Sequence, residues 1–266
     1  MGKTLKSAWL AAFLCLLTFR AEAEITAREL DYAAGEERLR GYLAYPANLK
    51  KGRKIPGVLV VHEWWGHNDY VRYRARMLAE LGYAAFAIDM YGAGKLASHP
   101  AEARAFAQAS LRTFPAAERR FRAALAELNR LPFVDPERHA AIGYCFGGGV
   151  VLNMARANLP LKGVVSFHGG LAALTQARRN PGPAILVLHG ADDAFVPAAQ
   201  IASFKAEMKN AGANFKFISY PGVKHAFTSK AADEQAKKFK LPVAYDAEAD
   251  RASWKEMQTF LREVLK

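Results

Sequence analysis

Gly143-Tyr144-Cys145-Phe146-Gly147-Gly148 predicts a sharp turn between a strand and a helix. An apolar run enters this turn at residues 139–142, and a run of small residues leaves it at residues 148–159. Glycine is needed on both sides of the turn, because the backbone of the nucleophile is strained and side chains beside it would collide with the adjacent strand and helix. The context is typical of a nucleophile elbow, in which Cys145 stands where serine is usual. We expect Cys145 to be a nucleophile, and a buried apolar cysteine is the alternative.

Strand-like and helical segments alternate along the rest of the chain. At 266 residues, of which 52% are hydrophobic, the chain can bury a full core in one domain. Strands that alternate with helices form a mostly parallel sheet covered on both faces. We therefore expect a single α/β domain over residues 24–266, with a mostly parallel central sheet flanked by helices. The expected strands are a pair within 25–46 and the runs 55–61, 83–88, 139–142, 161–167, 184–188 and 215–220, and the expected helices are 70–81, 100–111, 115–131, 148–159, 197–211 and 247–265.

The first residues predict a secretory signal peptide. Lys3 and Lys6 precede an apolar run over residues 8–19, and Ala21-Glu22-Ala23 resembles a cleavage site. The run is shorter than the ~20 residues of a membrane span, although an uncleaved anchor is the alternative. Residues 1–23 are therefore expected to be removed, which leaves an exported chain, periplasmic or secreted, without a membrane span.

The charge of the expected mature chain is strongly basic, but its basic residues are scattered. The whole sequence carries a formal charge of +12, and loss of residues 1–23, with three Lys or Arg and one Glu, leaves +10. No long basic block with interleaved aromatic residues occurs, so no nucleic-acid partner is expected. The charge would attract anionic substrates or membrane surfaces. Cys145 is the single cysteine left, and a lone thiol cannot form an internal disulfide.

Reactive residues recur where the expected strands end. Glu63, Cys145, His168, Asp193 and His225 each lie at or just after such an end. Parallel sheets place their chemistry at the carboxyl ends of the strands, so these side chains should gather at one edge.

The spacing also suggests how three of these groups would cooperate. His225 would accept the thiol proton of Cys145, and an acid would orient the imidazole. Asp193 is our choice for that acid, although the neighbouring Asp192 fits the spacing equally well. The order nucleophile, acid, histidine is that of α/β-hydrolases.

Four separated motifs together resemble the dienelactone hydrolase family. They are the elbow at residues 143–148, His62-Glu63, the segment 193–197 and Lys224-His225-Ala226-Phe227. The resemblance extends over about residues 39–265 and implies an α/β-hydrolase fold without a cofactor. It implies an ester or lactone hydrolase of the carboxymethylenebutenolidase type.

The resemblance also assigns roles to single residues. It implies a triad of Cys145, Asp193 and His225, with the backbone N–H groups of Trp64 and Phe146 as the oxyanion hole. It implies that Glu63 is the family's additional carboxylate beside the cysteine. A carboxylate there would raise the pKa of the thiol and hold its proton, which would protect an exported cysteine from oxidation.

The chain departs from the family pattern at two positions that bear on the substrate. Members that act on dienelactone carry an arginine four residues after the catalytic histidine, where this chain has Ser229. They carry another after the strand exit that corresponds to residues 89–91, where this chain runs through Gly92-Ala93-Gly94-Lys95. A lysine does not replace a bidentate arginine clamp without loss, so dienelactone itself is not the expected substrate.

Several further residues are candidates for the wall of a substrate pocket. They are Trp65, Tyr91, Lys95 and His168, and Trp65 could equally pack under a lid. His62 and His67 invite a zinc interpretation, but their spacing is not that of H-E-x-x-H, so no metal is expected.

The sequence thus predicts an exported, thiol-dependent hydrolase of small esters or lactones that forms an acyl-enzyme on Cys145. A thioesterase or a small peptide hydrolase on the same triad is one alternative. A non-catalytic binding protein on the same fold is another, because a fold does not determine a function. The substrate would be a small molecule, and the basic charge allows an anionic one.

Overall fold

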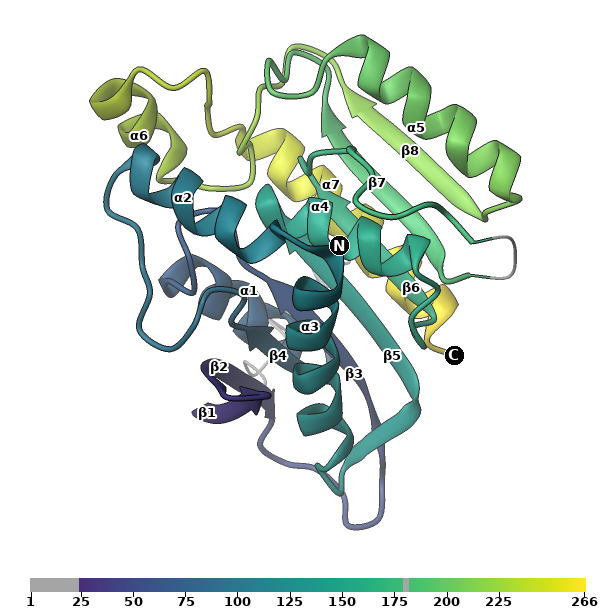
Figure 1. Cartoon of the computed structure of the whole chain (residues 1–266). Coiled ribbons are helices and arrows are strands. Elements are labelled where there is room, and N and C mark those ends of the chain that lie inside the picture. The colour runs from purple at the N-terminus through teal and green to yellow at the C-terminus, as the bar shows by residue number, and fades with distance from the viewer. Residues whose placement is uncertain (1–23, 179–181) are drawn as a thin grey trace, which may run out of the picture.

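One sheet runs through the computed structural model, which describes residues 24–178 and 182–266 (Figure 1). The expected signal peptide, residues 1–23, lies outside the described residues. The strands follow one another across the sheet in the order β1-β2-β4-β3-β5-β6-β7-β8. Their bounds are β1 Ile25–Ala34, β2 Glu37–Pro46, β3 Ile55–Val61, β4 Ala84–Ile88, β5 Val134–Tyr144, β6 Gly163–Phe167, β7 Ala184–Gly190 and β8 Phe215–Tyr220.

Most neighbouring strands in this sheet run parallel. The pairs β4–β3, β3–β5, β5–β6, β6–β7 and β7–β8 are parallel, and only β1–β2 and β2–β4 are antiparallel. Parallel strands require crossover connections, and most of them in this chain contain helices; the described part of the connection from β6 to β7 contains none. The prediction of an α/β fold with a mostly parallel sheet is confirmed.

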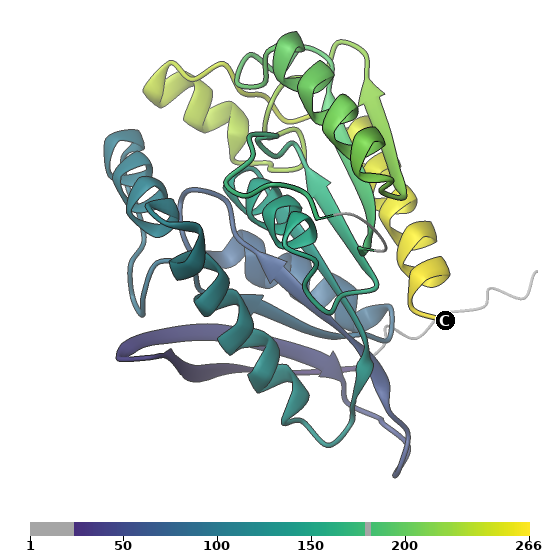
Figure 2. The same ribbon diagram turned by 45° about the vertical axis from the view of Figure 1, so that its right-hand side comes forward.

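Helices cover both faces of the sheet (Figure 2). Buried side chains of α3, α4 and α5 belong to the core on one face, and those of α1 and α7 to the core on the other. The bounds are α1 Asp69–Glu80, α2 Pro100–Leu111, α3 Phe114–Asn129, α4 Phe146–Arg156, α5 Ala198–Ala211, α6 Ala232–Phe239 and α7 Ala247–Val264.

Strand β3 shows why the sequence forms a sheet buried on both sides. Successive side chains of a strand point to opposite faces, so Leu59 and Val61 enter one core while Val58 and Val60 enter the other. All four side chains are fully buried. Such an uninterrupted apolar run is typical of a central parallel strand.

Helices α2 and α6 lie beside each other near the carboxyl ends of the parallel strands (Figure 1). The ring of His99, which caps α2, packs against Phe239 at the end of α6 with 5.4 Å between ring centres. Helix α6 was not among the expected elements, whereas α2 was. Among the described residues, no helix is long and apolar enough to cross a membrane.

Candidate active site

The turn between β5 and α4 holds Cys145 in a backbone conformation that amino acids with side chains rarely adopt. Its φ is 52° and its ψ is −113°, and it caps α4 directly after the strand ends. A methyl group on Gly143 would overlap the carbonyl group of Gly147, and one on Gly147 would overlap the backbone of Val61. Glycine at both positions therefore lets the elbow pack tightly and present the thiol at the sheet edge.

His225 lies between an acid and this thiol. Its Nδ1 lies 2.7 Å from Oδ2 of Asp193, whose other oxygen accepts a hydrogen bond from the N–H of Phe195. Asp193 is buried and Asp192 is exposed, so the structure pairs the imidazole with Asp193. The imidazole and the thiol of Cys145 line the same cavity.

The pKa of His225 depends on its burial and on the charges of the two groups beside its ring. Burial alone would lower the pKa of His225, but a thiolate at Cys145 and the bonded carboxylate of Asp193 outweigh it and raise the pKa to about 10. A base that gains affinity for a proton as the thiol ionises can take that proton.

Glu63 lies at the end of β3 and lines the same cavity as Cys145 and His225. Its side chain is almost fully buried, and this burial raises its pKa to about 7 despite the opposing positive charges of His225 and Arg74. Within the described part of the chain, its carboxyl group forms no hydrogen bond with another residue. The group can therefore hold or release a proton near neutral pH beside the thiol.

Two backbone N–H groups flank Cys145 without internal partners. Trp64 follows β3 and Phe146 begins α4, and both residues line the cavity. Neither N–H donates a hydrogen bond within the described residues. Their placement suits donors that would bind a developing oxyanion.

A cavity of about 280 Å³ opens above Cys145. Trp64 and Trp65 line it from the loop after β3, and Phe195 from the loop after β7. Helices α2 and α6 add Leu111 and Gln235. The remaining wall residues are Gly149, Asn153, Gly170, Ala172, Leu174, Ala226, Leu241 and Val243.

Three residues expected in the wall lie elsewhere. Tyr91 lies beneath it, where its hydroxyl donates to the carbonyl of Trp64 and its ring packs on Phe146. Lys95 is exposed and lies beside Gly92 on a separate part of the surface. His168 is fully buried behind the nucleophile. The expectation that these three line the pocket is therefore corrected.

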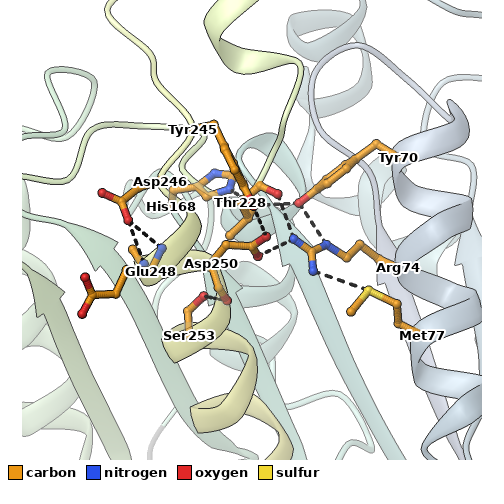
Figure 3. A network of polar contacts seen from close by, with 11 residues as sticks. Tyr70, Arg74, Met77, His168, Thr228, Tyr245, Asp246, Glu248, Asp250 and Ser253 are labelled. Carbon is orange, nitrogen blue, oxygen red and sulfur yellow. Dashed lines mark hydrogen bonds and ion pairs between the residues drawn. The ribbon is translucent and has the colours of Figure 1, made fainter.

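His168 instead belongs to a buried polar network (Figure 3), and it also contacts the backbone of the elbow. The N–H of Cys145 donates to its Nδ1 at 3.1 Å, so Nε2 must carry the ring proton. The Nε2–H group of His168 donates to Oγ1 of Thr228 at 2.7 Å. The same Oγ1 lies 2.6 Å from the hydroxyl of Tyr70. Burial and the positive charge of His225 hold the pKa of His168 well below its usual value. The ring thus stays neutral and fixes the backbone behind the thiol.

Arg74 lies at the far end of this network (Figure 3). Its guanidinium donates to the carbonyl of Thr228 at 2.8 Å and to Asp250 at 2.5 Å. The ring of Tyr144 packs against the same guanidinium, 5.5 Å from its centre. The network therefore joins α1 and α7 to the loop that carries His225.

His62 and His67 each form hydrogen bonds with different backbone groups. His62 donates from Nδ1 to the carbonyl of Glu63 and accepts from the N–H of Met90. His67 lies 3.0 Å from the carbonyl of Ala87. No cluster of three metal-binding side chains occurs among the described residues.

Sequence reasoning missed part of the wall and all of the buried network. Leu111, Gln235 and Leu241 come from helices and loops that reach the cavity only through the tertiary fold. Arg74 offers a weak signal, because a charged residue interrupts the apolar face of an otherwise regular helix. A search for such interruptions would have singled it out.

Comparison with known proteins places this geometry among hydrolases. Residues 39–265 match the family described as "Dienelactone hydrolase family". A Methylorubrum extorquens protein named "Putative carboxymethylenebutenolidase" is 28% identical over 231 residues, which cover 83% of this chain and 76% of the relative. A Saccharolobus solfataricus protein of the same name is 26% identical over 90% of this chain and 99% of its own.

Among solved structures, a dienelactone hydrolase-like promiscuous phosphotriesterase from metagenomic libraries is similar throughout. It superposes with a TM-score of 0.81 and 32% identity, and the match covers 91% of this chain and 99% of the other.

Proposed function

The chain belongs to the dienelactone hydrolase family, and from this premise we propose that it hydrolyses small esters or lactones through an acyl-enzyme on Cys145. The observation that carries the proposal is the position of His225, whose Nδ1 is paired with Asp193 and whose ring lines the same cavity as the thiol of Cys145. That arrangement supplies a nucleophile, a base and an orienting acid at the wall of one cavity.

The first half of the reaction forms the acyl-enzyme. His225 takes the thiol proton, and the Cys145 sulfur attacks the carbonyl carbon while the carbonyl π electrons move to its oxygen. The N–H groups of Trp64 and Phe146 bind this oxyanion. The oxyanion then reforms the carbonyl and expels the alkoxide, which takes the proton from His225.

The second half regenerates the thiol. His225 removes a proton from water, and the resulting hydroxide attacks the acyl carbon. The carbon–sulfur bond breaks, the carboxylic acid leaves, and the thiolate regains the proton held by the imidazole. Asp193 keeps the ring in one tautomer in both halves.

Glu63 would control when the thiol ionises. Its buried carboxyl group lies on the same cavity wall, and a negative charge there opposes a thiolate. We propose that Cys145 rests mainly neutral and ionises when substrate displaces Glu63. Iodoacetamide labelling at fixed pH tests this, because Glu63→Gln should be alkylated faster, and an unchanged rate would contradict the role.

Turnover of p-nitrophenyl acetate tests the reaction itself. Mass spectrometry of quenched enzyme should find an acetyl group on Cys145, and Cys145→Ala should abolish both adduct and turnover. Exposed Asp192 offers a matched control for Asp193: Asp192→Asn should keep activity and Asp193→Asn should lose at least ~100-fold. Turnover without an adduct, or unchanged activity in Cys145→Ala, would refute the mechanism and favour a binding protein.

Acyl thioesters and short peptides should be assayed beside the oxygen esters, because the same triad would act on them. We also propose that the enzyme is exported after cleavage near Ala23. Cell fractionation and N-terminal sequencing of the product test this, and a cytoplasmic chain that retains residues 1–23 would refute it.

A further inference from the structure

The cavity above Cys145 is apolar to a degree that limits its substrates. Among the described residues, no lysine or arginine lines it. Its ionisable groups are Glu63 and the two reacting side chains, Cys145 and His225. This contrasts with the basic charge of the whole chain, which by itself would favour an anionic ligand.

The basic side chains considered for an anion site are either paired with other groups or lie outside the cavity wall. Arg74 is buried and bonded to Asp250 and the carbonyl of Thr228. Lys95 and Lys224 are exposed, and neither lines the cavity. A bound carboxylate would therefore find no lysine or arginine in the described wall, and the imidazole of His225 is already paired with Asp193.

The polar side chains of the wall leave little for an anion. The amide of Asn153 donates to the carbonyls of Gly149 and Ala172 and accepts from the N–H of Leu174, so its hydrogen-bonding groups are occupied. Gln235 is the other amide side chain on the wall. A carboxylate stripped of water needs several donors or a cation to offset its loss of hydration.

The mouth of the cavity presents apolar surface to water. Phe195 is 45% exposed and Leu174 is 40% exposed, and both line the cavity. The ring of Phe195 packs edge-on against His225, with 4.9 Å between ring centres. An apolar group bound between these side chains would cover them beside the reacting atoms.

We propose that this cavity takes neutral esters whose acyl group is apolar and discriminates against esters that carry a carboxylate. The inference rests on the proposed function, since it names the substrate class of the same site. Three observations carry it: the absence of lysine and arginine from the wall residues described, the buried Glu63, and the exposed apolar mouth.

Three p-nitrophenyl esters of similar length test the inference. They are the heptanoate, the methyl adipate and the hydrogen adipate, which end in an alkyl group, a neutral ester and a carboxylate. After subtraction of the uncatalysed rate, kcat/KM for the hydrogen adipate should be at least ~100-fold below that for the heptanoate. The methyl adipate should lie within ~10-fold of the heptanoate. Equal or faster turnover of the hydrogen adipate would overturn the inference.

A charge added at the mouth should shift the preference. Leu174→Arg places a cation beside the cavity, and we expect it to raise the rate ratio of hydrogen adipate to heptanoate at least ~10-fold. Leu81→Arg is the matched control, because Leu81 is 41% exposed and does not line the cavity. A ratio that rises equally in both variants would trace the selectivity to total charge and refute the role of the wall.

Binding separates this inference from the proposed reaction. Quenching of tryptophan fluorescence in Cys145→Ala measures how tightly each ester binds when none can be turned over. Preferential binding of the heptanoate supports the inference even if the wild-type protein hydrolyses none of the three, in which case only the proposed function fails. Equal binding of heptanoate and hydrogen adipate refutes the inference even if Cys145-dependent turnover is found.

Discussion

Replacing Arg74 with methionine tests how far the buried network supports the fold. The Arg74 side chain is 3% exposed, and its partner Asp250 is 16% exposed. Methionine keeps the aliphatic stem but leaves the carboxylate of Asp250 and the carbonyl of Thr228 without their cationic partner. Removing one partner of a buried ion pair lowers the free energy of unfolding by about 3–5 kcal/mol.

The structure favours the lower end of this range. Asp250 is reached by water, and the hydroxyl of Tyr245 lies 3.4 Å from its other oxygen. We therefore expect Arg74→Met to lose about 3 kcal/mol, which corresponds to a fall in Tm of about 6–12 °C in a domain of this size. Urea unfolding at pH 7 gives the free energy, and a thermal scan gives the Tm.

Arg122 provides the matched control. It is 50% exposed and pairs with Glu118 one helical turn away, so Arg122→Met should cost only about 0.3–0.5 kcal/mol. Asp250→Asn combined with Arg74→Met should be less destabilising than the sum of the two single changes, because the pair is lost only once. Equal stability of Arg74→Met and Arg122→Met would refute the reasoning.

Three further substitutions address the elbow, the buried acid and the neutral histidine. Gly143→Ala should lose about 3 kcal/mol or more by urea unfolding, because its methyl group overlaps the helix that follows, and a midpoint like that of the wild type would contradict the packing. Folding raises the pKa of Glu63 from 4.5 to about 7, so the folded state binds the extra proton and the wild type loses stability as pH rises through that window. Glu63→Gln should therefore become the more stable protein by about 3 kcal/mol at pH 8, with a smaller gap at pH 5, and a gap that does not grow would contradict the shift. Thr228→Val should cost about 1–3 kcal/mol because the Nε2–H group of His168 loses its acceptor, whereas the exposed Thr113→Val should cost far less.

The sequence predicts this fold well wherever an element is marked by local chemistry. The run 55–61 is bounded by polar residues and appears as β3 with the expected limits. The elbow needs glycine two residues before and two residues after Cys145, and it was predicted from these glycines together with the runs at residues 139–142 and 148–159. Helix α6 was missed because it is short: Ala232, Ala236 and Phe239 recur at helical spacing, but eight residues with two alanines on the apolar side give a weak signal.

The candidate reactive groups were predictable for a related reason. Parallel strands end at one edge of the sheet, so Glu63, Cys145, Asp193 and His225 converge once the strands are assigned. The same rule misplaced His168, because position at a strand end does not determine where a side chain points. Its ring turns away from the cavity to accept the N–H of Cys145.

The residues of the cavity wall could be identified only from the tertiary structure. They change the substrate charge that the composition suggests. A formal charge of +12 is a property of the whole surface, and it acts on a ligand through water and salt. Selectivity at the reacting carbonyl depends on the few groups that touch the ligand after water has left. At that short range this basic protein offers mainly tryptophan, leucine and phenylalanine, together with one buried acid and the reacting cysteine and histidine. The surface charge can speed the approach of an anion, but the cavity penalises its entry, so substrate choice follows the wall and not the net charge.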